Sequence, residues 1–249
     1  MSDDRLRCSF ERVAEAYERS RPGYAPTALA WLAERIGIGP GRRVLDLAAG
    51  TGKLTRQLLT LGADVVAVEP GDEMRGVLVR VVSEAETLAG SAEAIPLPDA
   101  AVDAVTVGQA FHWFRTEEAL GEIHRVLRPG GALALLWNEW DHQDPLQRAV
   151  DELVSGLRPR REEEGTPQWA AAVEASLLFG PLEERDFRHT RTLDADRLVD
   201  WVSSTSPVAS AHPAVQERVE DQVRALAGHG PLELTIMTRV YVTDRVSVS

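Results

Sequence analysis

The stretch Val44-Leu-Asp-Leu-Ala-Ala-Gly-Thr-Gly-Lys-Leu-Thr55 decides the fold of this chain of 249 residues. Its apolar start predicts a buried strand, and Gly50 and Gly52 predict a tight turn into a helix. A second acid, Glu69, closes the next apolar run, twenty-three residues after Asp46. Glycines let a backbone approach a ligand closely, and an acid at the end of the second strand can bind a ribose diol. The stretch therefore indicates a nucleoside-bearing cofactor over the ends of these strands.

Apolar runs and helical periodicity alternate on both sides of this turn. The expected strands are 43–47, 65–68, 87–90, 102–108 and 132–137, and the expected helices between them are 54–61, 72–83 and 117–127. Such alternation implies right-handed crossovers and a mostly parallel sheet that helices cover on both faces. We therefore predict an α/β fold with a doubly wound, mostly parallel sheet.

The flanking segments carry weaker patterns. Helical spacing before the alternating region predicts helices over 8–20 and 29–36. After Trp137 we expect helices over 147–157, 196–203 and 213–227, a loop over 158–168, and strands over 182–189 and 232–242. The last of these strands is expected to run antiparallel at the edge of the sheet.

Composition excludes several classes of partner. The 39 acidic and 27 basic side chains give a formal charge of −12, which argues against nucleic acid, because phosphate binding needs a basic surface. No run of eighteen apolar residues is present, so we expect no membrane span. The single cysteine, Cys8, excludes an internal disulfide, fits a reducing compartment and makes a poor metal site. We expect a cytoplasmic protein without a metal.

The run from Asp46 has the form Asp-x-Ala-x-Gly-x-Gly and is followed in register by three further segments, Ser91–Asp99, Val102–Val105 and Arg125–Gly131. Together they resemble class I S-adenosylmethionine (SAM)-dependent methyltransferases over roughly residues 40–137. The resemblance implies a Rossmann-like sheet of seven strands, SAM as cofactor and S-adenosylhomocysteine as product. The chain departs from the family pattern at Ala48, where glycine is usual, and at Ser91, where relatives often have aspartate.

The resemblance also implies roles for residues of the cofactor site. The glycine turn with Asp46 would hold the cofactor, Glu69 would bind the ribose, and Met74 would pack near the ribose or adenine. Ala92 and Glu93 match the segment at the adenine edge. The predicted cofactor residues of this part are Asp46, Ala48, Gly50, Gly52, Glu69, Met74, Ala92 and Glu93.

The segment Gly108-Gln-Ala-Phe-His-Trp-Phe114 follows the fourth strand, and ligands lie outside the carboxyl ends of parallel strands. Gln109 is therefore expected to line the methionine part of the cofactor, and His112 and Trp113 to face the space between cofactor and acceptor. This form of the segment resembles the methyltransferase type 11 group that includes trans-aconitate-methyltransferase-like proteins. His112 is the candidate general base, since its ordinary pKa is near neutrality; alternatively it shapes an aromatic pocket.

The same group implies a lid before the core. Tyr17 and Arg21 are expected to close over the cofactor, with Arg21 pairing a carboxylate, although a packed tyrosine and a solvated arginine would fit as well. Trp137 and Trp140 are expected to line the acceptor pocket, or else to belong to the core. The predicted organisation is a lid over 1–39, a SAM-binding core over 40–140, and a C-terminal cap with the final strands over 141–249.

Three functions fit this sequence. The favoured one is methyl transfer to a small-molecule acceptor, directed to oxygen or to a carboxylate, by in-line displacement that the enzyme promotes through positioning. The second is a SAM-binding protein that uses the pocket for another reaction or for regulation. The third, a nicotinamide oxidoreductase, is less favoured. The third glycine of G-x-G-x-x-G is missing after Gly50, and Asp46 would repel a pyrophosphate.

Overall fold

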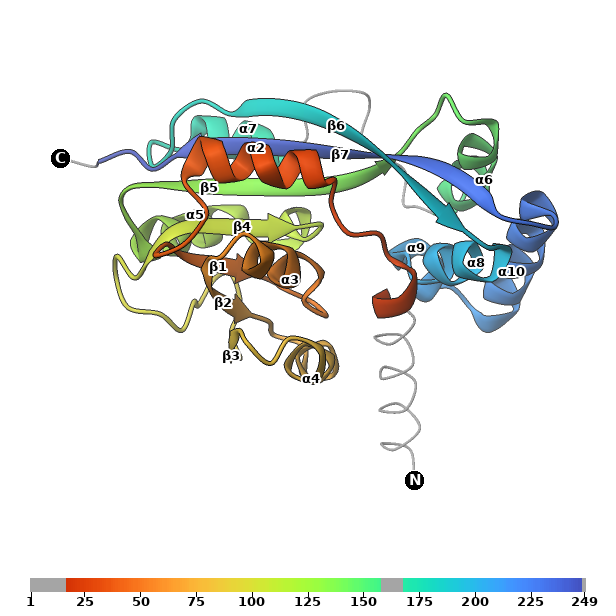
Figure 1. Ribbon diagram of the computed structural model, residues 1–249, viewed down its shortest axis with the longest axis horizontal. Coiled ribbons are helices and arrows are strands. Elements are labelled where there is room, and N and C mark those ends of the chain that lie inside the picture. The colour runs from red at the N-terminus through yellow and green to blue at the C-terminus, as the bar shows by residue number, and fades with distance from the viewer. Residues whose placement is uncertain (1–16, 158–167, 248–249) are drawn as a thin grey trace. The chain divides into compact units, whose positions relative to one another are not determined.

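The computed structural model describes residues 17–157 and 168–247 (Figure 1). Seven strands form one sheet in the order β3-β2-β1-β4-β5-β7-β6. They are β1 (Arg43–Leu47), β2 (Asp64–Val68), β3 (Glu86–Leu88), β4 (Val102–Gly108), β5 (Leu127–Trp140), β6 (Glu183–Leu193) and β7 (Leu232–Asp244). The pairings among β1 to β5 are parallel, and β7 runs opposite to β5 and β6 (Figure 1). The predicted α/β fold with a seven-stranded, mostly parallel sheet is confirmed.

Helices connect these strands. They are α2 (Pro26–Ile36), α3 (Lys53–Thr60), α4 (Asp72–Val81), the short 3₁₀ helix η1 (Phe111–Trp113), α5 (Thr116–Val126), α6 (Pro145–Ser155), α7 (Gln168–Ala175), α8 (Ala195–Ser203), α9 (Ser206–Ala209) and α10 (Pro213–Ala227). Residues 17–20 are also helical, and the rest of the helix predicted over 8–20 lies outside the described residues. Within 17–157 and 168–247, no helix is long and apolar enough to cross a membrane.

The chain forms two compact units. The described part of the first, the helical unit, is 17–22, 139–157 and 188–237. The second, the sheet unit, is 23–138, 168–187 and 238–247. These units do not follow the predicted lid, core and cap segments one for one, and the lid and cap functions of those segments stay predictions.

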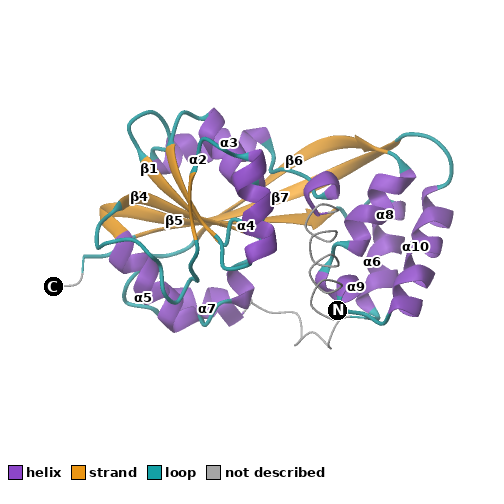
Figure 2. Ribbon diagram, turned by 90° about the horizontal axis from the view of Figure 1, so that it is seen from below, coloured by secondary structure: helices purple, strands orange, loops and turns teal. Residues whose placement is uncertain are grey.

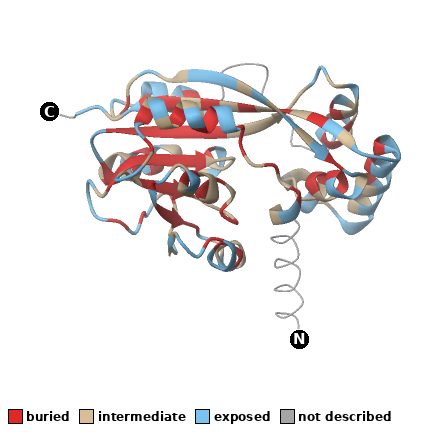
Figure 3. Cartoon of the chain, in the orientation of Figure 1, coloured by how far each residue is buried: buried red, intermediate tan, exposed pale blue. Residues whose placement is uncertain are grey.

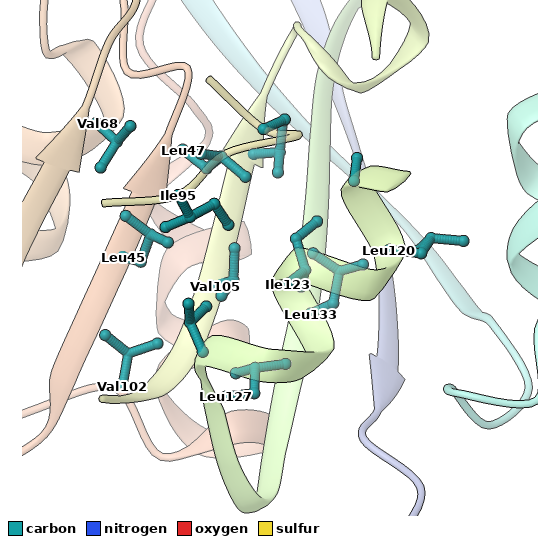
Figure 4. Close-up of a cluster of buried hydrophobic side chains, with 14 of the residues drawn as sticks. Leu45, Leu47, Val68, Ile95, Val102, Val105, Leu120, Ile123, Leu127 and Leu133 are labelled. Carbon is teal, nitrogen blue, oxygen red and sulfur yellow. The ribbon is translucent and has the colours of Figure 1, made fainter. Parts of the chain in front are cut away.

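The sheet unit is built in three layers, with α2 and α3 on one face of the strands and α5 and α7 on the other (Figure 2). Successive strand residues point to opposite faces, so Val44 packs against α2 and α3 while Leu45 packs against α5. Strands β1, β2 and β4 are buried over most of their length, whereas the outer sides of the helices, many loop residues and much of β6 are exposed (Figure 3). Figure 4 shows the layer beside α5, which is formed by Leu45, Leu47, Val68, Ile95, Val105, Ile123, Leu133 and their neighbours.

The expected place of the last strand was wrong. β7 lies between β5 and β6, and β6 forms the edge. Buried residues recur at every second position through most of β7, whereas only Leu193 of β6 is buried. An edge strand has one neighbour and less cover, which matches the more polar sequence of β6.

The turn after β1 holds the backbone in unusual conformations. Ala48, Gly50 and Gly52 all have positive φ angles, of 56°, 60° and 85°. A left-handed conformation costs an ordinary residue about 1–2 kcal/mol, because its Cβ approaches the following carbonyl oxygen. Ala48 therefore carries strain at the position where the resemblance led us to note the absence of glycine.

Asp103 stabilises the opposite, amino-terminal end of the sheet. Only 8% of the residue is exposed, and its Oδ2 accepts hydrogen bonds from the Arg43 N–H at 2.8 Å and from the Arg128 Nη1 at 2.8 Å. Burial acts to raise the pKa of Asp103, but the hydrogen bonds from Arg43 and Arg128 and the nearby charge of Arg42 outweigh it and lower the pKa. This motif residue therefore holds β1, β4 and β5 together.

Ala48→Gly is expected to stabilise the protein by about 1 kcal/mol, since strain relief exceeds the added entropy of the unfolded chain. The measurement is urea unfolding monitored by circular dichroism. Ala49→Gly is the control, because Ala49 has no positive φ and the change should instead cost about 0.4–1 kcal/mol. Equal losses in both variants would contradict the strain at Ala48.

Asp103→Asn is expected to lower the free energy of unfolding by about 1–3 kcal/mol at pH 7. Because the folded pKa of Asp103 is depressed, the carboxylate stabilises the fold above its unfolded pKa of about 3.9, and this stabilisation is lost as the pH falls through the folded pKa. The difference between wild type and variant, measured by denaturant unfolding from pH 7 to pH 3, should therefore shrink at the acid end. A constant difference would contradict this account.

Candidate functional site

Glu69 joins two turns at the carboxyl end of the sheet. It follows β2 directly, and its carboxylate accepts the Gly50 N–H at 2.8 Å through Oε2 and the Gly71 N–H at 2.9 Å through Oε1. Only 7% of the residue is exposed. Desolvation raises the pKa of Glu69 from its ordinary value, against the lowering effect of these two hydrogen bonds and of the Arg75 charge. The acid therefore fixes the positions of the β1–α3 and β2–α4 turns relative to each other.

Asp46 lies beneath the glycine turn. It is 1% exposed, and its Oδ2 accepts a hydrogen bond from the Thr55 hydroxyl of α3 at 2.6 Å. Desolvation raises the pKa of Asp46 to about 7, with the Thr55 hydrogen bonds opposing the shift and the charge of Glu69 adding to it. Asp46 thus ties the strand to the helix that follows it. Its expected part in holding the cofactor stays a prediction.

The two glycines of the turn have different surroundings. A Cβ on Gly52 would overlap Leu78 and come within 2.8 Å of Val82 Cγ2, so this glycine allows α3 and α4 to pack closely. A Cβ on Gly50 would meet no atom within 4 Å. Gly50 therefore presents backbone toward open space, on the residue whose N–H bonds to Glu69.

Gln109 directly follows the neighbouring strand β4 and has a strained backbone conformation. Its φ is 61°, its N–H donates to the Leu136 carbonyl at 2.8 Å, and its amide Nε2 donates to the Asn138 carbonyl at 3.1 Å. The adjacent Gly108 has no room for a side chain, because the Tyr24 hydroxyl occupies that space. Since β1 and β4 pair in parallel, Gln109 lies at the same end of the sheet as the glycine turn.

Side chains of α5 hold the predicted adenine segment in place. Arg125 donates to the Ile95 carbonyl at 3.0 Å and to the Leu97 carbonyl at 2.8 Å, and Glu122 accepts the Ile95 N–H at 2.9 Å. Ala92 is buried in the core beside this segment. Glu93 accepts the Arg115 N–H at 3.0 Å; burial acts to raise its pKa, but its hydrogen bonds prevail and lower it. Arg125 and Glu122 therefore set the path of the loop that carries both predicted adenine residues.

Met74 completes the predicted cofactor residues of the sheet unit. It is half-buried on α4 and lies beside Gly71, whose N–H bonds to Glu69. The structure thus brings the glycine turn, Glu69 and Met74 together, and places Gln109 and the adenine segment after β4 and β3 of the same sheet.

His112 and Trp113 form η1, directly after β4. Their rings lie 4.8 Å apart, and Trp113 is 67% exposed. His112 is also exposed as a residue, yet surrounding atoms desolvate its ring enough to lower the pKa. The lowered pKa favours the neutral form of the imidazole. Among the residues of known position, no three His, Cys, Asp or Glu side chains could hold a metal ion together.

Trp137 belongs to an aromatic cluster of the sheet unit. It stacks on Trp169 of α7 at 4.7 Å and meets the edge of Tyr241 at 5.7 Å. Trp169 also contacts Phe111 at 5.8 Å. Trp169 and Tyr241 thereby occupy part of the surface that Trp137 could offer to an acceptor. The predicted place of Trp137 in the acceptor pocket stays a prediction.

Tyr17, Arg21 and Trp140 belong to the helical unit. The Arg21 guanidinium lies 5.1 Å from the Tyr17 ring and donates to the Ser204 Oγ at 2.9 Å and the Ser204 carbonyl at 3.0 Å. Trp140 stacks on the buried Trp201 at 4.2 Å. Arg21 thus has neutral partners at the end of α8, and its predicted pairing with a carboxylate stays a prediction.

Sequence reasoning missed several residues that shape the site. Thr55 binds Asp46, Tyr24 fills the space beside Gly108, and Arg75 donates to the Glu69 carbonyl at 2.9 Å. A buried acid needs a donor, so a hydroxyl in the first helical turn after Asp46 was the one available signal. The other two contacts depend on tertiary packing alone.

Comparisons with known proteins agree with this geometry. Residues 45–135 match the family model described as a methyltransferase domain. An uncharacterized methyltransferase of Schizosaccharomyces pombe is 41% identical over 254 residues, which cover 97% of this chain and 98% of the relative. An uncharacterized methyltransferase of Mycobacterium bovis is 39% identical over 224 residues, covering 90% of this chain and 87% of the relative.

Solved structures share the fold at lower identity. A protein of Anaeromyxobacter dehalogenans that bears the name of a type II methyltransferase aligns with a TM-score of 0.63 and 22% identity, over 90% of this chain and 97% of that one. Geranyl diphosphate methyltransferase in complex with SAM aligns with a TM-score of 0.52 and 14% identity, over 89% of this chain and 85% of that one. The strand order, the glycine turn and these relatives lead to one conclusion: the chain belongs to the class I methyltransferase family.

Proposed function

We propose that this protein transfers a methyl group from SAM to a small molecule. The observation that carries the proposal is the hydrogen bond between Glu69 and Gly50: a buried carboxylate directly after β2 is bonded to a glycine of the β1–α3 turn whose free side is open. A ribose diol needs an acceptor pair at a fixed distance from a backbone that can be approached closely. The family and its SAM-bound member support the choice of cofactor.

The residues present fit this cofactor. Each oxygen of Glu69 accepts one backbone N–H, which leaves further lone pairs for two ribose hydroxyls. The adenine would lie along Ala92 and Glu93, with Met74 beside the ribose. Gln109 would line the methionine part. SAM, when bound, supplies a methyl group already activated by the sulfonium.

The protein's own contribution to the reaction is then mainly positional. The chain would hold the acceptor in line with the methyl group at about 3 Å and exclude water from the reacting atoms. We propose an acceptor oxygen, of a hydroxyl or a carboxylate. A carboxylate needs no base, whereas for a hydroxyl His112 would accept the proton, which its neutral ring allows. The single cysteine favours a reducing compartment, and we propose the cytoplasm.

Glu69→Gln is expected to weaken SAM binding by about 1–3 kcal/mol, roughly tenfold or more. The amide brings an N–H₂ group against the Gly50 or Gly71 N–H and accepts the ribose hydroxyls less well. Isothermal calorimetry with SAM and S-adenosylhomocysteine measures the change. The control is Glu73→Gln, a change of the same charge near the start of α4. Equal affinity of the Glu69 variant and wild type would remove its ribose role, and NAD binding without SAM binding would overturn the proposed cofactor.

His112→Ala is expected to lower kcat by about 10²-fold or more for a hydroxyl acceptor, with SAM affinity unchanged. Candidate acceptors are screened by mass spectrometry for the gain of one methylene group, and kcat is then measured on the acceptor found. His124→Ala, on α5, serves as the control for loss of a histidine. An unaltered kcat in the His112 variant would leave that residue as part of the pocket wall.

A further inference from the structure

The part of β6 that belongs to the helical unit carries two half-buried basic side chains. His189 and Arg191 are two residues apart, so they project from the same face of the strand, and the buried Leu193 follows on that face. Arg188, Thr190 and Thr192, on the other face, are exposed. The basic pair is therefore turned toward the interior side of the strand.

Arg191 has no acidic partner among the described residues. Its one hydrogen bond goes from Nη1 to the Ser20 carbonyl at 3.4 Å, which leaves most of its five N–H donors unused. Burial lowers the pKa of Arg191, and the charge of Arg197 lowers it further. The charged group that acts on Arg191 is thus a second cation, Arg197.

Several other arginines are paired with acids, whereas Arg21, like Arg191, donates hydrogen bonds to neutral groups. Arg35 binds Glu183 and Asp244, Arg125 binds Glu122 and Asp99, and Arg239 binds Asp186 and Glu184. Acidic side chains outnumber basic ones by 39 to 27. Desolvating a guanidinium without an anion is costly, so a half-buried arginine with no acid beside it among residues 17–157 and 168–247 would be stabilised by an anionic ligand.

His189 adds a second unsatisfied group beside Arg191. Its Nδ1 is buried without a hydrogen-bond partner in the described structure. Burial lowers the pKa of His189, and the charge of Arg191 adds to this effect. A buried polar atom of this kind normally finds a partner.

We propose that the helical unit binds a carboxylate group of a small molecule at Arg191. The planar fork of a guanidinium matches the two oxygens of a carboxylate. One guanidinium balances a single negative charge, which favours a carboxylate over a dianionic phosphate. If the proposed methyl transfer is correct, this site gives the chain a means of recognising an acidic molecule apart from the cofactor residues of the sheet unit.

The test measures binding of acetate, succinate, citrate and inorganic phosphate by calorimetry to wild type, Arg191→Gln and Arg188→Gln. The Arg188 variant removes the same charge from the exposed face of β6. At least one carboxylate is expected to bind wild type and the Arg188 variant alike, and to bind the Arg191 variant at least tenfold more weakly. Absence of carboxylate binding, equal affinity in the Arg191 variant, or tighter binding of phosphate would overturn the proposal.

Two further readouts separate this site from other roles. Thermal unfolding of the free proteins should show the Arg191 variant no less stable than wild type, because it removes a desolvated charge; a lower midpoint with intact carboxylate binding would make Arg191 a structural residue. S-adenosylhomocysteine should bind all three proteins equally. If S-adenosylhomocysteine binds more weakly to the Arg191 variant alone, the arginine binds the cofactor's own carboxylate and the proposal is overturned. If S-adenosylhomocysteine binds to none of the three proteins, the result counts against SAM as the cofactor and not against the carboxylate site.

Discussion

The carboxylate of Glu69 is the interaction on which the candidate site depends. Two turns, each following a parallel strand, are joined through its hydrogen bonds to Gly50 and Gly71. The Ala49 N–H also donates to the Val68 carbonyl at 3.1 Å, so the carboxylate reinforces a backbone contact where the two strands end. Removing water from this acid raises its pKa, and the two N–H donors offset part of that cost. A ligand that adds hydroxyl donors would continue the same compensation, which is why this position suits a ribose.

The residues that carry the family resemblance divide by the end of the sheet at which they lie. Asp46, Gly50, Gly52, Glu69 and Gln109 lie at the carboxyl ends of the strands and shape the candidate site. Asp103 and Arg128 lie at the amino end and hold strands together, 2.8 Å from each other. Arg125 falls between the two sets, since it anchors the adenine segment without belonging to it. The family match over 45–135 therefore covers residues at both ends of the sheet.

The parts of the fold that follow from local patterns were predictable, and those that depend on long-range packing were not. Buried parallel strands such as β1 and β4 are continuous apolar runs, so their existence and their order along the chain followed from the sequence. Helix α7 was missed because its short alanine-rich run lacks a clear amphipathic face, and β7 was misplaced because a strand pattern does not say which neighbour it will have. Arg21 and Arg191 show the same limit at the level of side chains. Nothing in either segment reveals that Ser204 satisfies the first while the second has no acid beside it.

Backbone strain supports this view of the site only in combination with packing. Ala48 and Gln109, after the adjacent strands β1 and β4, both have positive φ angles, at about 1–3 kcal/mol each. Ala100 is equally strained, yet it lies in a loop before β4, where its N–H bonds to the Arg125 carbonyl at 2.9 Å. Strain by itself therefore does not mark function. What distinguishes the first two is their place after the carboxyl ends of two adjacent parallel strands, the end of the sheet where Glu69 is buried and Gly50 leaves open backbone.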